Sequence, residues 1–331
     1  MRLENFLALT HTSLINEPCV NSFENIVFEA SKVKRGDLFF AFDEKEIDIA
    51  VTNGAYGVIF DKPTQISDSE IAWIKSQNLD DTLKKLLRFK MIEKEVVVYE
   101  CNEIILKLAL QVITQTNFLV ILGDMQSIYK SMNNMDQKTT LLFCPTLNDK
   151  DIFANAKKLP SNHTKTIEIM EQTLFETSFI YDDIYYERQL ISPFFIPYLE
   201  ELLYLYKSLK INFRLKKFIP INHFEPVFTN KKFEIKNFGA SDKVLIFEPN
   251  TELIESEILF LKSRASWANI IFIVPKSSIC RDYDGIFRYE NDTQIIDILK
   301  TNNFNFALIV GVNKSILEKP IVHHAQLTLD F

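Results

Sequence analysis

The residues best suited to chemistry lie in one run, Gly123-Asp124-Met-Gln126-Ser127, with Lys130 three positions further along. A glycine, a serine and a lysine after an apolar strand are the residue types that bind nucleotide phosphates. Glycine amides surround the phosphate oxygens, a lysine neutralises them and a hydroxyl binds magnesium. The spacing does not fit, because none of the chain's seven glycines forms a GxxxxGK[ST] or GxGxxG pattern. A standard phosphate loop and a standard dinucleotide fingerprint are therefore excluded, and an ordinary helix start after a buried strand is the interpretation that we favour.

The other reactive residue types form no recognisable site. His323 and His324 are adjacent, so on a strand they point to opposite faces and cannot bind one metal ion. The four cysteines are far apart and include no CxxC pair, which is typical of reduced thiols and not of a zinc site. No Ser-His-Asp or Cys-His arrangement can be argued from spacing. We expect no metal site, and we expect Asp182 and Asp183 to lie in a solvated loop.

Composition and charge indicate a globular protein of two or three domains. The 331 residues are 47% hydrophobic and 24% charged, with no low-complexity tract. The net charge of −7 argues against a general nucleic-acid binder, which would present a basic face. The N-terminus has an acid at Glu4 where a signal peptide would be basic, and no apolar run has the length of a membrane span. These features predict a cytoplasmic protein without a transmembrane segment.

The elements that must position these residues fall into three regions, 1–90, 91–238 and 239–331, and the predicted fold class is α/β. Residues 1–90 have the pattern of a small α/β domain. For residues 91–238 we expect a short α/β region that ends in an irregular linker. The predicted strands are 37–42, 57–60, 118–122 and 140–144. The predicted helices are 49–53, 80–89, 102–116, 126–132 and 194–209, and the linker is 210–236.

Residues 239–331 alternate between strand and helix patterns. The strands are predicted at 243–247, 269–274 and 304–311, and the helices at 251–263 and 293–300. This alternation is typical of a parallel, Rossmann-like sheet.

Ser31-Lys32, followed by Gly36-Asp-Leu-Phe-Phe-Ala41, is the most informative motif. It resembles the opening motif of the Mur ligase family, the ATP-dependent UDP-N-acetylmuramoyl-peptide ligases, in which a Ser-Arg pair precedes a Gly-Asp-Leu-Phe-x-Ala run. The similarity continues through Ala50, Gly54-Ala55 and the helix that begins near Asp81. It implies a Mur-ligase-like N-terminal domain, a shortened central region and a Rossmann-like C-terminal domain.

The resemblance also implies an ATP site, and the chain has lost it. The family's phosphate loop, close to T-G-x-N-G-K-T-T, would fall at Gly123–Lys130. In that register Gln126 replaces the phosphate-binding lysine, Ser127 replaces the magnesium-binding threonine, and Asp124 places a negative charge against the phosphates. The central region is also shorter than the family's. No cofactor is therefore expected, and Mg-ATP would be one only if the chain were an active ligase.

The implied substrate site keeps two candidate residues. Ser31 and Lys32 would contact the uracil or ribose of a UDP-muramyl peptide, although a plain loop before a strand explains them equally well. The segment from Phe42 to Ile49 is too short for the family's Asp-Gly-His turn near the diphosphate.

The last six residues suggest a different kind of partner. Gln326, Leu327, Leu329 and Phe331 resemble the short peptide with which many bacterial proteins bind the replication sliding clamp. The same alternation describes an ordinary edge strand, which is the reading that we favour.

Three hypotheses follow for the function. The first, which we adopt, is a pseudoenzyme of cytoplasmic peptidoglycan precursor metabolism that binds a UDP-muramyl ligand or serves as a scaffold for peptidoglycan-synthesis proteins. The second is an active amino-acid or dipeptide ligase with an unorthodox ATP site. The third is an interaction module that uses the C-terminal peptide or the apolar helix 194–209.

Overall fold

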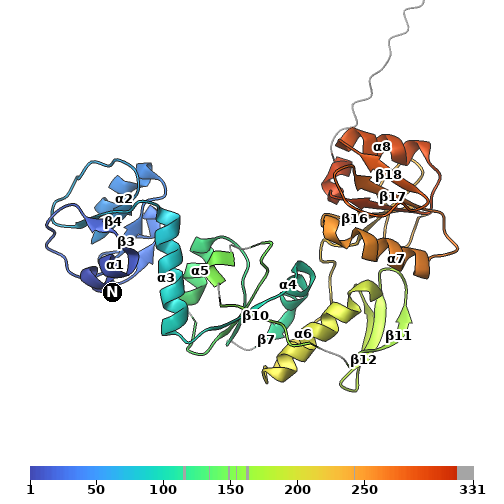
Figure 1. The fold of residues 1–331 in the computed structure, drawn as a ribbon, viewed down its shortest axis with the longest axis horizontal. Helices are drawn as coiled ribbons and strands as arrows, with labels where there is room; N and C mark the ends of the chain where they lie inside the picture. The colour runs from blue at the N-terminus through green and yellow to red at the C-terminus, as the bar shows by residue number, and fades with distance from the viewer. Residues whose placement is uncertain are drawn as a thin grey trace, which may run out of the picture. The chain divides into compact units, whose positions relative to one another are not determined.

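The computed structural model describes residues 1–114, 117–133, 135–147, 150–153, 155–161, 164–241 and 243–318. The chain folds into two compact units (Figure 1). The first consists of Met1–Leu106 and Thr114–Leu159, and the second of Lys107–Ile113 and Pro160–Phe331. The boundaries expected near residues 90 and 238 are not those of the two units and stay predictions.

The first unit begins with a five-stranded sheet in the order β1-β5-β4-β3-β2, parallel except for β1. Its strands are β1 (Ser13–Leu14), β2 (Ile26–Val27), β3 (Leu38–Phe40), β4 (Gly57–Phe60) and β5 (Ala72–Lys75). Its helices are α1 (Leu3–Thr10), η1 (Ala30–Lys32), η2 (Glu44–Glu46), α2 (Ile47–Thr52) and α3 (Leu79–Glu93). Every residue of β3 and β4 is buried, as expected for parallel strands that are covered on both faces.

A second sheet in this unit has four parallel strands in the order β10-β6-β9-β8. Its elements are β6 (Val97–Glu100), β8 (Phe118–Val120), α5 (Met125–Asn133), β9 (Thr140–Phe143), η3 (Lys150–Phe153) and β10 (Lys157–Lys158). Helix α4 (Glu103–Ala109) begins in the first unit and ends in the second. Helix α3 contacts α1 on one side and α5 on the other (Figure 1). Leu83 and Leu86 of α3 share one hydrophobic core with Leu141 and Phe143 of β9, so the two sheets fold around common apolar side chains.

The helix predicted over 102–116 is wrong in its second half. Helix α4 ends at Ala109, and β7 (Val112–Thr114) forms a two-stranded sheet with β14 (Phe213–Leu215). Val112, Ile113 and Thr114 are all β-branched, and such side chains fit a strand better than a helix.

The second unit contains a three-stranded antiparallel sheet that the sequence patterns did not reveal. Its strands are β11 (Glu168–Gln172), β12 (Thr177–Tyr181) and β13 (Ile184–Gln189). All five residues of β11 are exposed, so the strand lacks the apolar alternation that would predict it. Asp182 and Asp183 both have positive φ, 46° and 61°, as a two-residue hairpin turn requires. They lie in a turn, as predicted.

The predicted linker over 210–236 is also wrong in part, because it contains strands β14 and β15 (Glu225–Thr229). Strand β15 pairs antiparallel with β16 (Lys243–Glu248) along its whole length. Before it, η4 (Pro193–Phe195) leads into α6 (Ile196–Ser208), whose Leu199, Leu202 and Leu203 are fully buried. This helix closely matches the one predicted at 194–209.

The C-terminal sheet has the order β15-β16-β19-β17-β18 and is parallel apart from β15. Its other elements are η5 (Thr251–Leu253), α7 (Ile254–Arg264), β17 (Ile270–Pro275), β18 (Ile286–Tyr289), α8 (Asp292–Thr301), β19 (Phe306–Val310) and η6 (Lys314–Glu318). The predicted Rossmann-like alternation is confirmed, with β19 buried along its whole length at the centre of the sheet.

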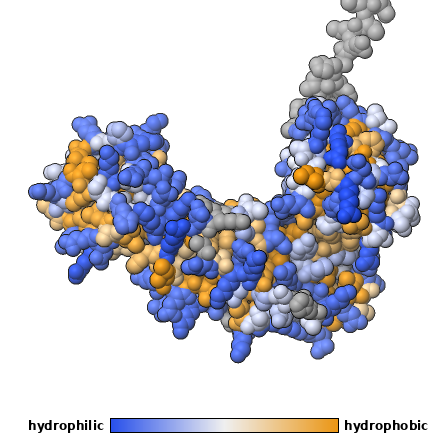
Figure 2. Space-filling model, in the orientation of Figure 1, coloured by the Kyte–Doolittle hydropathy of each residue, from blue (hydrophilic) through white to orange (hydrophobic). Residues whose placement is uncertain are grey.

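The surface carries hydrophobic residues scattered among hydrophilic ones on the face seen in Figure 2. In the described part of the chain, no helix combines the length and the apolar character that crossing a membrane would need.

Candidate functional site

Glu29 lies where the two sequence-predicted sites meet. Its carboxylate forms ion pairs with Lys32 Nζ and with Lys130 Nζ, each at 2.6 Å. The hydrogen bond from Lys130, and next that from Lys32, lower the pKa of Glu29 to about 2. Lys32 is a predicted ligand-binding residue and Lys130 belongs to the degenerate phosphate loop, so the structure brings these two predictions together.

The loop that carries Ser31 and Lys32 is fixed by buried and half-buried polar contacts. The Ala30 amide donates to Glu46 Oε2 at 3.2 Å, and Asn53 Nδ2 donates to the Ala30 carbonyl at 2.9 Å. These bonds hold η1 at the surface, with the side chains of Ser31 and Lys32 exposed to solvent. An exposed, rigidly held pair can contact a ligand without first being ordered.

The Gly36-Asp37 part of the motif has a structural role. Asp37 is buried, and its carboxylate accepts from the Lys34 amide at 2.9 Å and from Asn25 Nδ2 at 3.0 Å. Gly36 has φ of 99°, a conformation that side chains other than glycine rarely adopt. These two residues therefore shape the turn into β3 and are not available to a ligand.

The loop at Gly123–Lys130, which the sequence analysis predicts to be a degenerate phosphate loop, is capped by its own acid. Gly123 has φ of 107°, and Asp124 Oδ1 accepts a hydrogen bond from the Ser127 amide at 2.8 Å at the start of α5. The hydrogen bonds from Ser127 lower the pKa of Asp124, so the side chain is an anion at neutral pH. The Asp124 carboxylate therefore accepts the hydrogen bond that the Ser127 amide would otherwise donate to a phosphate oxygen at this helix terminus.

The residues present do not fit Mg-ATP. Gln126 is neutral at the position that the resemblance assigns to a phosphate-binding lysine, and Lys130 is paired with Glu29. Ser127 contributes its amide to the Asp124 cap. No group of three or more His, Cys, Asp or Glu side chains able to hold a metal ion occurs within the described ranges.

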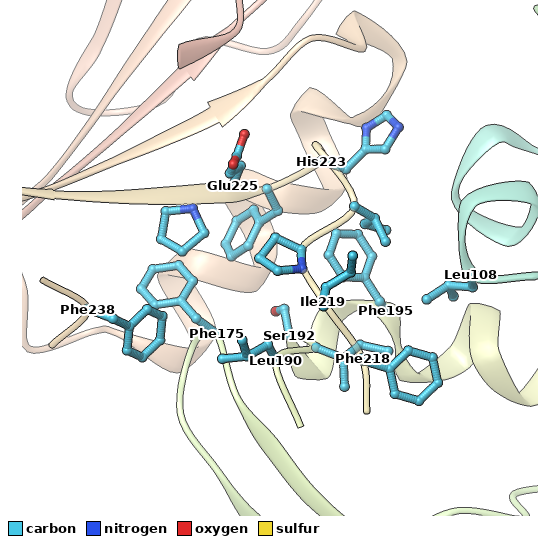
Figure 3. Close-up of a pocket in the computed structure, with 15 residues that line it drawn as sticks. Leu108, Phe175, Leu190, Ser192, Phe195, Phe218, Ile219, His223, Glu225 and Phe238 are labelled. Carbon is cyan, nitrogen blue, oxygen red and sulfur yellow. The ribbon is translucent and has the colours of Figure 1, made fainter. Parts of the chain in front are cut away.

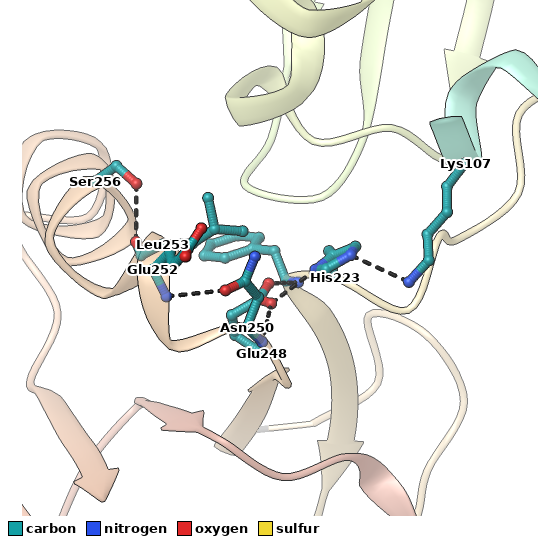
Figure 4. Close-up of polar contacts among 8 residues, drawn as sticks. Lys107, His223, Glu248, Asn250, Glu252, Leu253 and Ser256 are labelled. Carbon is teal, nitrogen blue, oxygen red and sulfur yellow. Dashed lines mark hydrogen bonds and ion pairs between the residues drawn. The ribbon is translucent and has the colours of Figure 1, made fainter. Parts of the chain in front are cut away.

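A buried polar network in the second unit was missed by the sequence reasoning. Glu248, the last residue of β16, contacts His223 Nδ1 at 2.7 Å and accepts from the amides of Phe224 at 3.0 Å and Asn250 at 2.7 Å. His223 Nε2 lies 3.1 Å from Lys107 Nζ (Figure 4). Because a carboxylate only accepts and an ammonium only donates, the imidazole carries its proton on Nδ1. The one sequence signal was a glutamate that ends an apolar strand.

Glu257 of α7 is buried beside this network. Neither of its carboxyl oxygens has a hydrogen-bond partner among the described residues. Burial, and next the neighbouring Glu248 carboxylate, raise the pKa of Glu257 well above its usual range, which favours its neutral form. The two buried acids therefore lie in different environments, because Glu248 has hydrogen-bond partners and Glu257 has none among the described residues.

The network has no room for a substrate, because the His223 and Glu248 side chains are fully buried. Figure 3 shows the cavity beside His223, which has about 30 Å³ of space and is lined mainly by apolar side chains such as Phe175, Phe195 and Phe218. Such a space holds one or two water molecules. We therefore assign His223 and Glu248 to the architecture of the unit and not to chemistry.

The remaining predicted residues cannot be placed. Gln326, Leu327, Leu329 and Phe331 lie outside the described residues, as do His323 and His324.

Comparison with known proteins identifies the class of fold. No protein-family model matches the chain, and no curated protein matches it in sequence. Among solved structures, it is similar to MurF from Acinetobacter baumannii, with a TM-score of 0.54 and 8% identity over 93% of this chain and 95% of that one. MurF ligase from Thermotoga maritima, solved in complex with ADP, gives a TM-score of 0.51 and 12% identity over 89% of this chain and 95% of that one.

The chain thus has a Mur-ligase-like α/β fold. The resemblance noted at Ser31–Ala41 is confirmed at the level of the fold.

Proposed function

We propose that this protein is a non-catalytic relative of the Mur ligases in cytoplasmic peptidoglycan precursor metabolism. In this role it binds a UDP-muramyl ligand, or holds peptidoglycan-synthesis proteins together, without forming a peptide bond. The proposal joins the Mur-ligase-like fold to a phosphate loop that no longer suits ATP.

The Asp124 cap is the observation that carries the proposal. Its carboxylate already accepts the Ser127 amide at the start of α5. A triphosphate at this position would meet a fixed negative charge and would find a glutamine where a lysine is needed. Two like charges in contact repel, so ATP binding is disfavoured before any chemistry begins.

The lysine pair supports retention of an anionic ligand. Lys32 and Lys130 share one carboxylate, so the three-residue cluster keeps a net charge of +1. All three side chains are partly exposed, which makes their ion pairs weak and easily exchanged. A UDP-muramyl ligand could replace Glu29 as the partner of Lys32, whose expected contact is the uracil or ribose, while the Ser31 hydroxyl offers a neighbouring hydrogen bond.

The test is isothermal calorimetry of the purified protein with UDP-MurNAc-tripeptide and, separately, with Mg-ATP. We expect heat of binding for the sugar nucleotide and none for Mg-ATP. Binding of both would contradict the loss of the ATP site, and release of ADP with an added amino acid or dipeptide would then show an active ligase. No binding of either would leave only the scaffold role.

Matched lysine variants locate the ligand. Lys32→Gln should weaken sugar-nucleotide binding about tenfold, the effect of losing one charge-assisted contact. Lys34→Gln removes a nearby exposed lysine with the same charge and should leave the affinity unchanged. Equal losses in both variants would indicate general electrostatic attraction and would remove the assignment of Lys32.

A further inference from the structure

A cavity of about 660 Å³ in the second unit is unused by the proposed function. Val244 and Phe306, at the amino-terminal ends of β16 and β19, line it, as does Trp267 just before β17. Open α/β sheets usually bind ligands at the opposite, carboxyl ends of their strands. Its volume is in the range of small-molecule sites. All residues that line the cavity belong to the second unit, whereas Glu29 belongs to the first, so the cavity is a separate site.

The cavity presents aromatic rings to solvent. The Trp267 side chain is 75% exposed and Phe238 is 49% exposed, although both are large and apolar. The Trp267 and Phe306 rings meet edge to face at 6.0 Å, and Phe228 and Phe238 lie 4.7 Å apart. Exposed rings gathered around a hollow indicate a binding surface, and they suit a planar ring as the ligand.

Two arginines and one acid, Glu176, line the same cavity, and together they give it a net charge of +1. Arg264, the last residue of α7, lines it and has no acidic partner in the part of the chain that the structure describes. Arg188 also lines it, and pairs with Glu176 at 3.3 Å while its side chain stays 70% exposed. A guanidinium binds carboxylates and phosphates through two parallel hydrogen bonds and stacks on flat rings.

The backbone around Arg188 departs from regular strand geometry. The pairing of β12 with β13 shifts between Thr177 and Phe179, and Arg188 has φ of 43°. Its amide donates to Ser178 Oγ at 3.0 Å, outside the regular ladder. Bulges of this kind redirect a side chain, and a residue other than glycine with positive φ is a strained choice that local contacts must maintain.

We propose that this cavity binds a small molecule that combines a planar aromatic ring with an anionic group. The ring packs against Trp267 and the neighbouring phenylalanines, and the anion pairs with Arg264, assisted by Arg188. A nucleoside monophosphate and an aromatic carboxylate share this chemistry. Neither Ser31 nor Lys32 takes part, so the inference stands apart from the proposed function.

Trp267 is a natural reporter for the test. The only other tryptophan, Trp73, is fully buried in the first unit. Intrinsic fluorescence excited at 295 nm is followed while adenosine 5′-monophosphate is added, with adenosine as the uncharged match. A second titration uses phenylacetate, with 2-phenylethanol as its match. We expect a saturable change with at least one anion, and at least fivefold weaker binding of its uncharged match.

Variants decide whether the site is the one proposed. Arg264→Gln should weaken binding of the anion at least fivefold, whereas Arg214→Gln, an exposed arginine of the same unit on β14, should leave it unchanged. Trp267→Phe should abolish the fluorescence response, while calorimetry still detects binding. The anion that binds with the higher affinity shows whether the ligand belongs to the nucleotides or to the aromatic carboxylates.

Two results would overturn the inference. One is the absence of saturable binding of either anion up to 10 mM, by fluorescence and by calorimetry. The other is binding that Arg264→Gln does not weaken. Lys32→Gln should leave this binding intact, which keeps the result independent of the sugar-nucleotide test.

Discussion

At the scale of single residues, the buried acids of the second unit dominate the electrostatics. Glu248 forms hydrogen bonds with His223 and two amides, whereas Glu257 lacks hydrogen bonds among the described residues, and burial raises its pKa. His223, before β15, contacts Glu248, and Lys107 on α4 contacts His223. Glu257, Glu201 and Glu248 all act electrostatically on Tyr198 of α6. Burial also raises the pKa of Tyr198 and of Glu201.

Glu257 should make stability depend on pH. Its pKa is raised in the folded protein, so above about 4.5, the ordinary pKa of a glutamate, the folded state holds a proton that the unfolded chain releases. The free energy of unfolding therefore falls as the pH rises, by up to about 1.4 kcal/mol per pH unit, until the folded-state pKa is passed. Urea unfolding followed by circular dichroism between pH 5 and 8 measures this slope.

Glu257→Gln should flatten the slope, because a glutamine does not titrate. Glu187→Gln, an exposed residue of β13, should retain it. A slope that is unchanged in Glu257→Gln would show that another group is responsible.

His223→Ala should lower the free energy of unfolding by about 3 kcal/mol. The substitution leaves the buried Glu248 carboxylate without its only side-chain hydrogen-bond partner among the described residues. Removing one member of a buried pair is strongly destabilising. The double variant His223→Ala with Glu248→Gln should lose less than the sum of the two single variants, since the pair acts together. Losses that simply add would mean that the two residues do not interact in solution.

The assignments of Ser31, Lys32 and the loop at Gly123–Lys130 stay predictions that rest on residue types and their order alone. The sequence could not predict Glu29 as the common partner of Lys32 and Lys130, because 101 positions separate Glu29 from Lys130 and only the fold brings them together. The pairing of His223 with Glu248 was invisible for the same reason.

At the scale of elements, the start of α5 depends on Asp124. Asp124→Ala removes the acceptor of the Ser127 amide and should lower the free energy of unfolding by about 1 kcal/mol, the usual effect of losing a helix cap. Asp124→Asn keeps an acceptor of the same shape and should retain most of the stability. Denaturant unfolding of the three proteins tests this, and equal stability of all three would contradict the capping role.

Burial explains which elements could be predicted. Strands such as β4 and β19 are continuous apolar runs, and their positions were predicted to within two residues. Strand β11 is polar and exposed, and β7 lies directly after a helix, so neither shows the alternation of apolar and polar residues that would predict a strand. Strand β15 was hidden because its proline and aromatic residues suggested a linker, whereas an edge strand tolerates a proline.

At the scale of the whole molecule, the two compact units should unfold separately. Each has its own hydrophobic core, one around α3 and β9 and another around β16, β17 and β19. We expect two transitions in differential scanning calorimetry. His223→Ala should lower the temperature of one transition and Asp124→Ala that of the other, because the two residues belong to different units. A single transition shifted by both variants would show one cooperative unit.

The fold as a whole was predictable from a short motif and from alternating patterns, whereas the boundaries expected near residues 90 and 238 stay predictions. The shared core of the two N-terminal sheets joins residues on both sides of position 90, and such packing leaves no mark in the local sequence.

The Asp124 cap also bears on how a nucleotide would have to compete at this loop. A tethered carboxylate acts as an intramolecular inhibitor, present at a high effective concentration that no dialysis or dilution can reduce. Any incoming phosphate binds only the fraction of molecules in which the cap is open, so its apparent affinity falls by that fraction. Replacing Gln126 with lysine would therefore restore little affinity for ATP by itself. Asp124 would have to be exchanged first, which makes the order of substitutions decisive for rebuilding an ATP site.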